Sequence, residues 1–132
     1  MMNINLVLNN QVATIPDHQN ILIDELDNIP ISACHSIVVH QVLNYLDAEQ
    51  IDKLLAKIRH TGVISISSLD IIEATTAFYR NEIELKDFSL LIQNQKLQHS
   101  LAEFKEFLER KQFEIESAGL HDIYFQIRAK RP

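Results

Sequence analysis

The sequence predicts a mixed α/β domain whose sheet has a parallel core, a C-terminal antiparallel hairpin and helices mainly on one face. Two observations predict it. A strand–helix–strand unit fills the middle of the chain, and such a unit requires a parallel pair of strands joined by a crossover. Two strands with a short connection close the chain, and a short connection makes a pair antiparallel. With 132 residues and no linker or internal repeat, residues 1–132 are predicted to form a single domain.

The first elements are short. The apolar run Asn3–Leu8 is consistent with a strand, and Ile21–Ile23 is a second short apolar run. Between them, a polar segment with Pro16 predicts a loop, in which Val12–Ile15 could form a further strand. The pattern leaves open whether Val12–Ile15 pairs with Asn3–Leu8 as a hairpin, and whether the first two strands run parallel.

The central unit begins with Ser36–Val42, whose β-branched residues are typical of a buried strand. Asp47 is a good N-cap for the next helix, and Gln50 completes a capping box. Apolar residues then recur at helical spacing on one stripe: Ile51, Leu54, Leu55 and Ile58. Gly62 predicts the end of this helix, and Val63–Ser67 is the next strand.

Further helices follow this strand. Asp70 can cap a helix that runs to about Arg80, and Leu85–Asn94 is a second helical stretch. The aromatic side chains of these two segments are expected to belong to the helix core: Phe78, Tyr79 and Phe88. Ser100 and Glu103 form another capping box, which opens a helix with one apolar face made of Leu101, Phe104 and Leu108.

The closing hairpin consists of Phe113–Ala118 and Ile123–Ala129, with a turn expected around Gly119. The last strand alternates between apolar and polar residues, and such alternation indicates a sheet with one solvent-exposed face.

Composition narrows the function classes. The formal net charge of −6 argues against nucleic acid as a partner, because phosphate binding needs a basic surface. No apolar run approaches the roughly 20 residues of a membrane span, and Met1–Asn10 lacks the pattern of a signal peptide. Cys34 is the only cysteine, which favours a reducing compartment and predicts a cytoplasmic location.

No catalytic or metal-binding constellation is predicted. The six histidines show no metal-ligand spacing, and His35 and His40 are expected to face opposite sides of a strand. Cys34 beside His35 lacks a third orienting group, and adjacent residues of an extended chain point apart, which argues against a nucleophile pair. The acidic segment 24–27 is typical of a solvated turn.

A series of segments carries a family resemblance: Asp24–Pro30, Ile37–Leu46, Arg59–Ile64 and Phe104–Ile115. In this order they resemble the acidic segment before the fourth strand, that strand with the motif after it, the turn into the fifth strand, and the last helix-to-strand step of the Rossmann-like (class I) S-adenosylmethionine-dependent methyltransferases. The likeness covers most of the chain and implies a reduced methyltransferase-like fold.

The chain departs from that family at the cofactor loop. The family's first strand is followed by glycines that let the backbone close on the cofactor. Asn5–Asn9 is the nearest counterpart here, and Val7 and Asn9 stand where the glycines belong. Only about a dozen residues separate Leu8 from Ile21, whereas one crossover alone needs a dozen or more. We therefore expect the family's first helices and its ribose-binding strand to be missing, and no cofactor to be bound.

Loss of those helices predicts a sheet that is covered on one face only. Alternation within Val63–Ser67 makes the uncovered face largely polar, whereas Ile37–Val39 is apolar on both sides. A modest hydrophobic spot is therefore expected near Val38. The partner-binding surface is predicted to comprise Val38, His40, Val63 and Ser65.

Three functional hypotheses follow from the resemblance and the departures from it. The leading one is a catalytically degenerate methyltransferase-like domain that binds another protein or copies of itself. The alternative is an active S-adenosylmethionine-dependent methyltransferase with a reduced site completed by another chain. Its cofactor-binding residues would be Asp24, Asp27, His40 and Gln41. The third is a small subunit that modulates a complete enzyme.

Overall fold

The computed structural model describes residues 2–9 and 13–132. Within them lies one six-stranded sheet in the order β2-β1-β3-β4-β6-β5. Its strands are β1 Met2–Val7, β2 Gln19–Leu22, β3 Cys34–His40, β4 Ile58–Leu69, β5 Glu114–His121 and β6 Tyr124–Lys130. The helices are α1 Ala48–Ala56, α2 Ile71–Tyr79, α3 Leu85–Ile92 and α4 Leu101–Arg110, with short 3-10 helices η1 Ile23–Asn28 and η2 Leu43–Tyr45. The first four strands pair in parallel and the last two antiparallel. The parallel core and the C-terminal antiparallel hairpin agree with the prediction.

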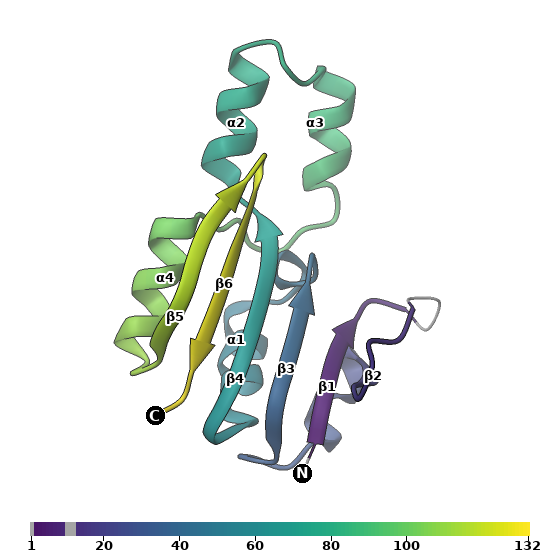
Figure 1. Ribbon diagram of the computed structural model, residues 1–132. Helices are drawn as coiled ribbons and strands as arrows, with labels where there is room; N and C mark the ends of the chain where they lie inside the picture. Colours follow the sequence, from purple (N-terminus) through teal and green to yellow (C-terminus); the bar gives the residue numbers. More distant parts are fainter. Residues whose placement is uncertain (1, 10–12) are drawn as a thin grey trace.

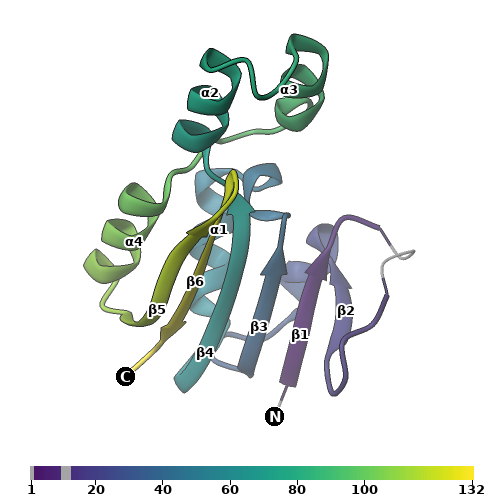
Figure 2. The ribbon, with the colours of Figure 1, turned by 45° about the horizontal axis from the view of Figure 1, so that its top comes forward.

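Helices cover one face of this sheet. In Figures 1 and 2, α1 and α4 lie on the far side of the strands, and within the described residues no helix lies across the near face. Alternate strand residues such as Ile37, Ile64 and Phe125 form one buried cluster with Leu54 of α1 and Phe104 of α4. The predicted arrangement of helices mainly on one face is confirmed. None of the helices in the described ranges has the length and apolar character needed to cross a membrane.

The two N-terminal strands pair directly and in parallel, with Ile4 opposite Gln19 and Val7 opposite Leu22. The described part of the connection between them contains neither helix nor strand. Of the candidate strand Val12–Ile15, the first residue lies outside the described residues and the others are not in a strand. The pairing of the first two strands, which the sequence pattern left open, is therefore parallel.

Gly62 does not end α1. The capping box is present as predicted, since the Gln50 N–H donates to Asp47 Oδ1 at 2.8 Å and the Asp47 N–H donates to Gln50 Oε1 at 2.9 Å. The helix, however, ends at Ala56, and Gly62 lies inside β4. A Cβ on Gly62 would lie 2.9 Å from the carbonyl oxygens of both Cys34 and Arg59. Glycine is therefore needed here for the close approach of backbones, not for a helix end.

Replacing Gly62 by alanine is expected to lower the free energy of unfolding by about 1–3 kcal/mol, because backbone oxygens must move to admit the methyl group. Gly119→Ala is the matched control, since a Cβ there would meet nothing within 4 Å. Urea denaturation of both variants measures the difference. Equal midpoints for the two variants would contradict the close approach of β3 and β4.

The C-terminal hairpin turns later than predicted. His121 pairs with Tyr124, so the connection is Asp122–Ile123, and Gly119 lies within β5. Asp122 has a positive φ of 53°. Aspartate tolerates the left-handed conformation that a two-residue hairpin loop requires, and a glycine is therefore not needed at the turn.

Helices α2 and α3 form a hairpin that projects beyond the sheet (Figures 1 and 2). Phe78 stacks on Phe88 with ring centroids 5.0 Å apart. Tyr79, by contrast, is 85% exposed, and α3 has no buried residue. The expectation that Tyr79 belongs to a helix core is wrong, because α2 leaves the sheet at its start and offers no second layer to its last turn.

Candidate functional site

The carboxyl ends of β1 to β4 meet at one edge of the sheet, which is where sheets of this type bind ligands. At this edge Val7, the last residue of β1, is only 2% exposed. Its side chain fills the end of the strand, and Leu8, which follows, is 45% exposed. A buried valine side chain thus stands at the position where the family resemblance expects a glycine.

Two of the candidate cofactor residues lie in η1. Asp24 follows the end of β2, and Asp27 pairs with Lys53 of α1 at 3.3 Å. The hydrogen bond from Lys53 to Asp27, and the charge of that carboxylate, raise the pKa of Lys53. Both aspartates line a small hollow of about 150 Å³ together with Gln50 and Lys53. Asp27 is thus engaged by α1.

His40 and Gln41 lie at the end of β3 and line two other hollows. Gln41 has a positive φ of 56°, and its N–H donates to the Ser67 carbonyl at 2.6 Å. This bend separates the two neighbours: His40 lines a groove on the sheet face and Gln41 a pocket under α3. The four residues proposed for a reduced cofactor site are therefore distributed over three hollows.

The pocket under α3 measures about 170 Å³ and is built around Asn44, which is 3% exposed. The Ser68 hydroxyl donates to Asn44 Oδ1 at 2.5 Å, and Asn44 Nδ2 donates to Gln95 Oε1 at 3.1 Å. The Asn44 carbonyl also accepts the N–H groups of Lys96 and Leu97. This network ties the segment after α3 to the sheet edge. In the sequence, the feature that could have indicated this network is a single polar residue, Asn44, within the apolar run Val42–Leu46.

The groove that His40 lines lies on the face of the sheet that no described helix covers, here called the open face. The volume of this groove is about 290 Å³. Three of the predicted partner-binding residues line it, namely Val38, His40 and Ser65. Val63 lies on β4 two residues before Ser65 and does not line the groove. The alternation of the strands thus places the predicted residues on one face of β3 and β4.

Charge on the open face is largely compensated. Arg128 Nε donates to Glu116 Oε1 at 3.1 Å, and a second guanidinium nitrogen donates to Ser65 Oγ at 3.3 Å. Over β1, a ring nitrogen of His18 lies 3.0 Å from Ser36 Oγ, so that His18 spans from the start of β2 to β3. The groove itself lies over β3, β4 and β6, with Ser117 of β5 also in its lining.

Cys34 and His35 do not form a nucleophile pair. Cys34 is fully buried, and this burial raises the pKa of its thiol. His35 is exposed. The two side chains thus differ completely in environment, as expected for neighbours in a strand.

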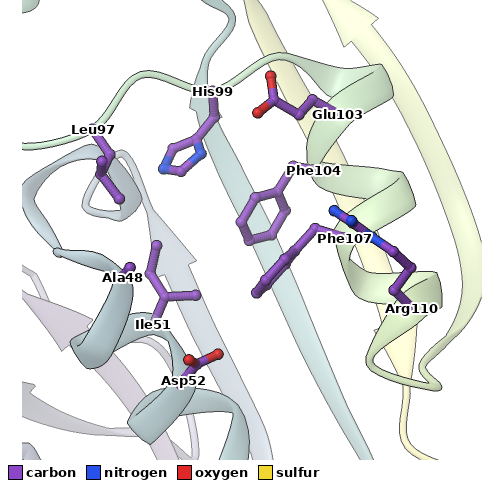
Figure 3. A pocket seen from close by; sticks show the side chains of 9 residues that line it. All are labelled: Ala48, Ile51, Asp52, Leu97, His99, Glu103, Phe104, Phe107 and Arg110. Atoms are coloured by element: carbon purple, nitrogen blue, oxygen red, sulfur yellow. The ribbon is translucent and has the colours of Figure 1, made fainter.

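A fourth hollow separates α1 from α4 on the helical side of the sheet (Figure 3). This α1–α4 pocket measures about 190 Å³, and its lining is mainly apolar: Ala48, Ile51, Leu97, Phe104 and Phe107, with Asp52, His99, Glu103 and Arg110 around them. The His99 ring meets Phe104 edge-on at 5.2 Å. Sequence reasoning missed this pocket, because it needs two helices that are distant in sequence.

The half-buried His99 predicts acid sensitivity. Its Nε2 atom is buried without a hydrogen-bond partner, and burial lowers the pKa of His99 to about 4 from 6.5. At a pH between these two pKa values, His99 is protonated in the unfolded chain and neutral in the folded chain. Stability is therefore unaffected by His99 above pH 6.5, and falls as the pH drops from 6.5 toward 4, by about 2 kcal/mol after allowance for partial solvent access.

Urea midpoints measured between pH 7 and pH 4 for the wild type and for His99→Phe test this effect. The variant is expected to lose less stability than the wild type over that window. His121→Gln, which alters an exposed histidine, is the control and should follow the wild type. Parallel curves for His99→Phe and the wild type would contradict the prediction.

No family model matches the chain, and no curated protein matches it. Several solved structures, however, resemble the fold of this chain. A SAM-dependent methyltransferase from Thermotoga maritima is 9% identical, with a TM-score of 0.67 over 99% of this chain and 82% of that chain. An S-adenosylmethionine-dependent methyltransferase from Mesorhizobium loti is 11% identical, with a TM-score of 0.66 over 98% of this chain and 80% of that chain.

A third match comes from a complex between the Trm112 methyltransferase activator and a methyltransferase of Haloferax volcanii. It is 8% identical, with a TM-score of 0.66 over 99% of this chain and 72% of that chain. Identities this low concern architecture only. The chain has the fold of the Rossmann-like S-adenosylmethionine-dependent methyltransferases.

Proposed function

We propose that this chain is a methyltransferase-like domain without catalytic activity that acts as a protein-binding or assembly module through its open face. The observation that carries the proposal is the one-sided cover of the sheet. The groove of about 290 Å³ on the uncovered side offers hydroxyl, amide and imidazole groups around Val38. A protein surface can satisfy such groups and cover the valine at the same time.

The sheet edge at the carboxyl ends of β1 to β4 supports the part of the proposal that the domain has no catalytic activity. Val7 is buried at the tip of β1, and the four candidate cofactor residues lie in three separate hollows. A sulfonium cofactor needs convergent groups and a close backbone approach in one place.

Isothermal calorimetry with S-adenosylmethionine and S-adenosylhomocysteine at millimolar concentration tests this half. No heat of binding is expected. Val7→Gly should not create affinity, because the candidate residues remain dispersed. A dissociation constant in the micromolar range for the wild type would contradict the proposal that the domain has no catalytic activity.

The chemistry of the open face indicates a partner that is a protein. The net charge of −6 disfavours nucleic acid, and Arg128, the cation in the groove, is paired with Glu116. One structural neighbour comes from a complex of a methyltransferase with a protein activator. That complex is consistent with folds of this kind taking protein partners.

Affinity capture from the native source, quantified by mass spectrometry, tests the binding surface. Val38→Arg and Ser65→Arg on the open face are each expected to abolish recovery of the same protein. Glu109→Arg, on the exposed side of α4, should leave its recovery unchanged. Equal recovery with all three variants would exclude the open face as the binding surface.

One observation favours the alternative of an active methyltransferase with a reduced site completed by another chain. β2 pairs directly with β1, and Asp24 follows its carboxyl end. The family resemblance implies an acidic residue in such a position for the ribose hydroxyls. If calorimetry shows cofactor binding, Asp24→Asn should weaken it, whereas Asp17→Asn in the preceding loop should not.

A further inference from the structure

We propose that the α1–α4 pocket receives Tyr79 of a second copy of this chain. The inference uses a surface on the helical side of the sheet and is independent of the open face. Four of the seven large apolar side chains that are exposed in the described residues lie on the α2–α3 hairpin, namely Ile72, Tyr79, Leu85 and Leu90. An apolar concentration of this kind marks a contact surface.

Tyr79 is the most exposed of these side chains, at 85%. It is the last residue of α2, at the end of the helix that projects away from the sheet (Figure 1). Its neighbour Phe78 holds the hairpin together by stacking on Phe88. Tyr79 has no such role within its own chain, and a rigid aromatic side chain loses little conformational freedom when it binds.

The α1–α4 pocket fits one aromatic ring. Its volume is about 190 Å³, and a cavity of about 150 Å³ is enough for benzene. Figure 3 shows Phe104 and Phe107 side by side along one wall, facing Ile51 and Leu97 across the opening. Rings at such a wall favour edge-to-face contact with an incoming ring.

The charges beside the tyrosine complement those around the pocket. Glu103 and Arg110 line the pocket, and neither forms an ion pair among the described residues. Tyr79 is followed by Arg80 and Glu82, which also form none. An inserted Tyr79 can therefore bring Arg80 toward Glu103 and Glu82 toward Arg110. This complementarity within one sequence is the reason to assign the pocket to a second copy.

Each copy has one hairpin and one pocket, and in one chain the tip of α2 points away from the pocket between α1 and α4 (Figures 1 and 2). The contact is therefore between different surfaces of the two partners. Such a contact yields either a reciprocal dimer or a longer assembly.

Sedimentation equilibrium over a range of concentrations measures the self-association. The wild type is expected to associate, and Tyr79→Ala is expected to weaken association by roughly tenfold or more, as for an aromatic anchor. Ile31→Ala, which alters a similarly exposed apolar residue outside the α2–α3 hairpin, is the matched control and should have little effect. A wild type that stays monomeric at millimolar concentration, or a Tyr79→Ala variant that associates normally, overturns the proposal.

A charge exchange separates recognition from damage to the fold. Arg80→Glu and Glu103→Arg should each weaken association, and the double variant should restore it, which a merely unfolded protein cannot do. Failure of the double variant to recover, with folding intact by circular dichroism, contradicts the proposed pairing.

Cross-linking locates the contact directly. Thr75→Cys, an exposed position one turn before Tyr79 on α2, keeps the tyrosine in place. Mixed with Ala48→Cys protein under mild oxidation, it should form a disulfide between two chains, because Ala48 is an exposed residue of the pocket lining. The native Cys34 is buried and does not compete. Absence of this heterodimer in a mixture that self-associates shows another interface. Val38→Arg should still self-associate, so this inference and the proposed function fail separately.

Discussion

Replacement of Phe104 by alanine is expected to lower the free energy of unfolding by about 3–5 kcal/mol. Phe104 is 3% exposed and joins α4 to the sheet. Its ring lies 6.2 Å from that of Phe125 in β6 and 5.4 Å from that of Phe107. Alanine would leave a cavity at the contact between α4 and β6, which closes one end of the core.

Leu54→Ala tests the same layer from α1 and should cost about 2–5 kcal/mol, since Leu54 is 1% exposed. Tyr79→Ala is the control for both and should change stability by less than about 0.5 kcal/mol. Urea denaturation monitored by circular dichroism gives the three values. A loss below about 1 kcal/mol for Phe104→Ala would mean that α4 does not pack on the sheet as described.

Asp70→Ala is the second substitution with a large expected effect, about 2–4 kcal/mol. Asp70 is 3% exposed, and its carboxylate serves two helices. Oδ1 accepts the N–H groups of Ile72 and Glu73 at the start of α2, and Oδ2 accepts the Leu101 N–H at the start of α4, at 2.8 Å. Alanine would leave these three donors without their partner.

Asp70→Asn separates the two roles of this carboxylate. The amide keeps one acceptor oxygen but turns the other position into a donor, which cannot satisfy the Leu101 N–H. We expect about half the loss found for alanine, with faster amide hydrogen exchange at Leu101 than at Ile72. Equal exchange at the two sites would show that Asp70 does not bridge the helices.

Local signals were interpreted correctly from the sequence. The caps at Asp47, Asp70 and Ser100 all accept backbone N–H groups at the starts of helices. A cap depends on contacts within three residues, so its pattern is complete in a short segment. The apolar alternation of β4 and β6 likewise predicted which residues face the helices, because strand geometry alone sets that period.

The predictions for Gly62 and Gly119, which the structure contradicts, concern residues whose role depends on another strand. Gly62 was interpreted as a helix end, but its role depends on the carbonyl of Cys34 in a neighbouring strand. The turn was placed at Gly119, but the pairing of β5 with β6 brings Asp122 to the loop. Each error concerns a position whose role depends on how two strands pair, and a pattern within one segment does not contain that information.

The candidate sites divide in the same way. Residues of the open face, such as Val38 and Ser65, follow from alternation within single strands, and the structure places them opposite each other on β3 and β4. The Asn44 network and the α1–α4 pocket were not predicted, since each joins segments from separate parts of the chain.

The sequence by itself determined most of the secondary structure elements and their apolar faces, because these follow from periodicity and caps within short segments. The one-sided sheet followed from the short N-terminal segment, which leaves no room for the family's first helices. Only the tertiary structure decided that β2 lies parallel beside β1, that Asp24 and Gln41 line different hollows, and that two helices enclose a pocket. These features arise from packing between distant segments, where the free energy depends on shapes that meet only in the folded chain.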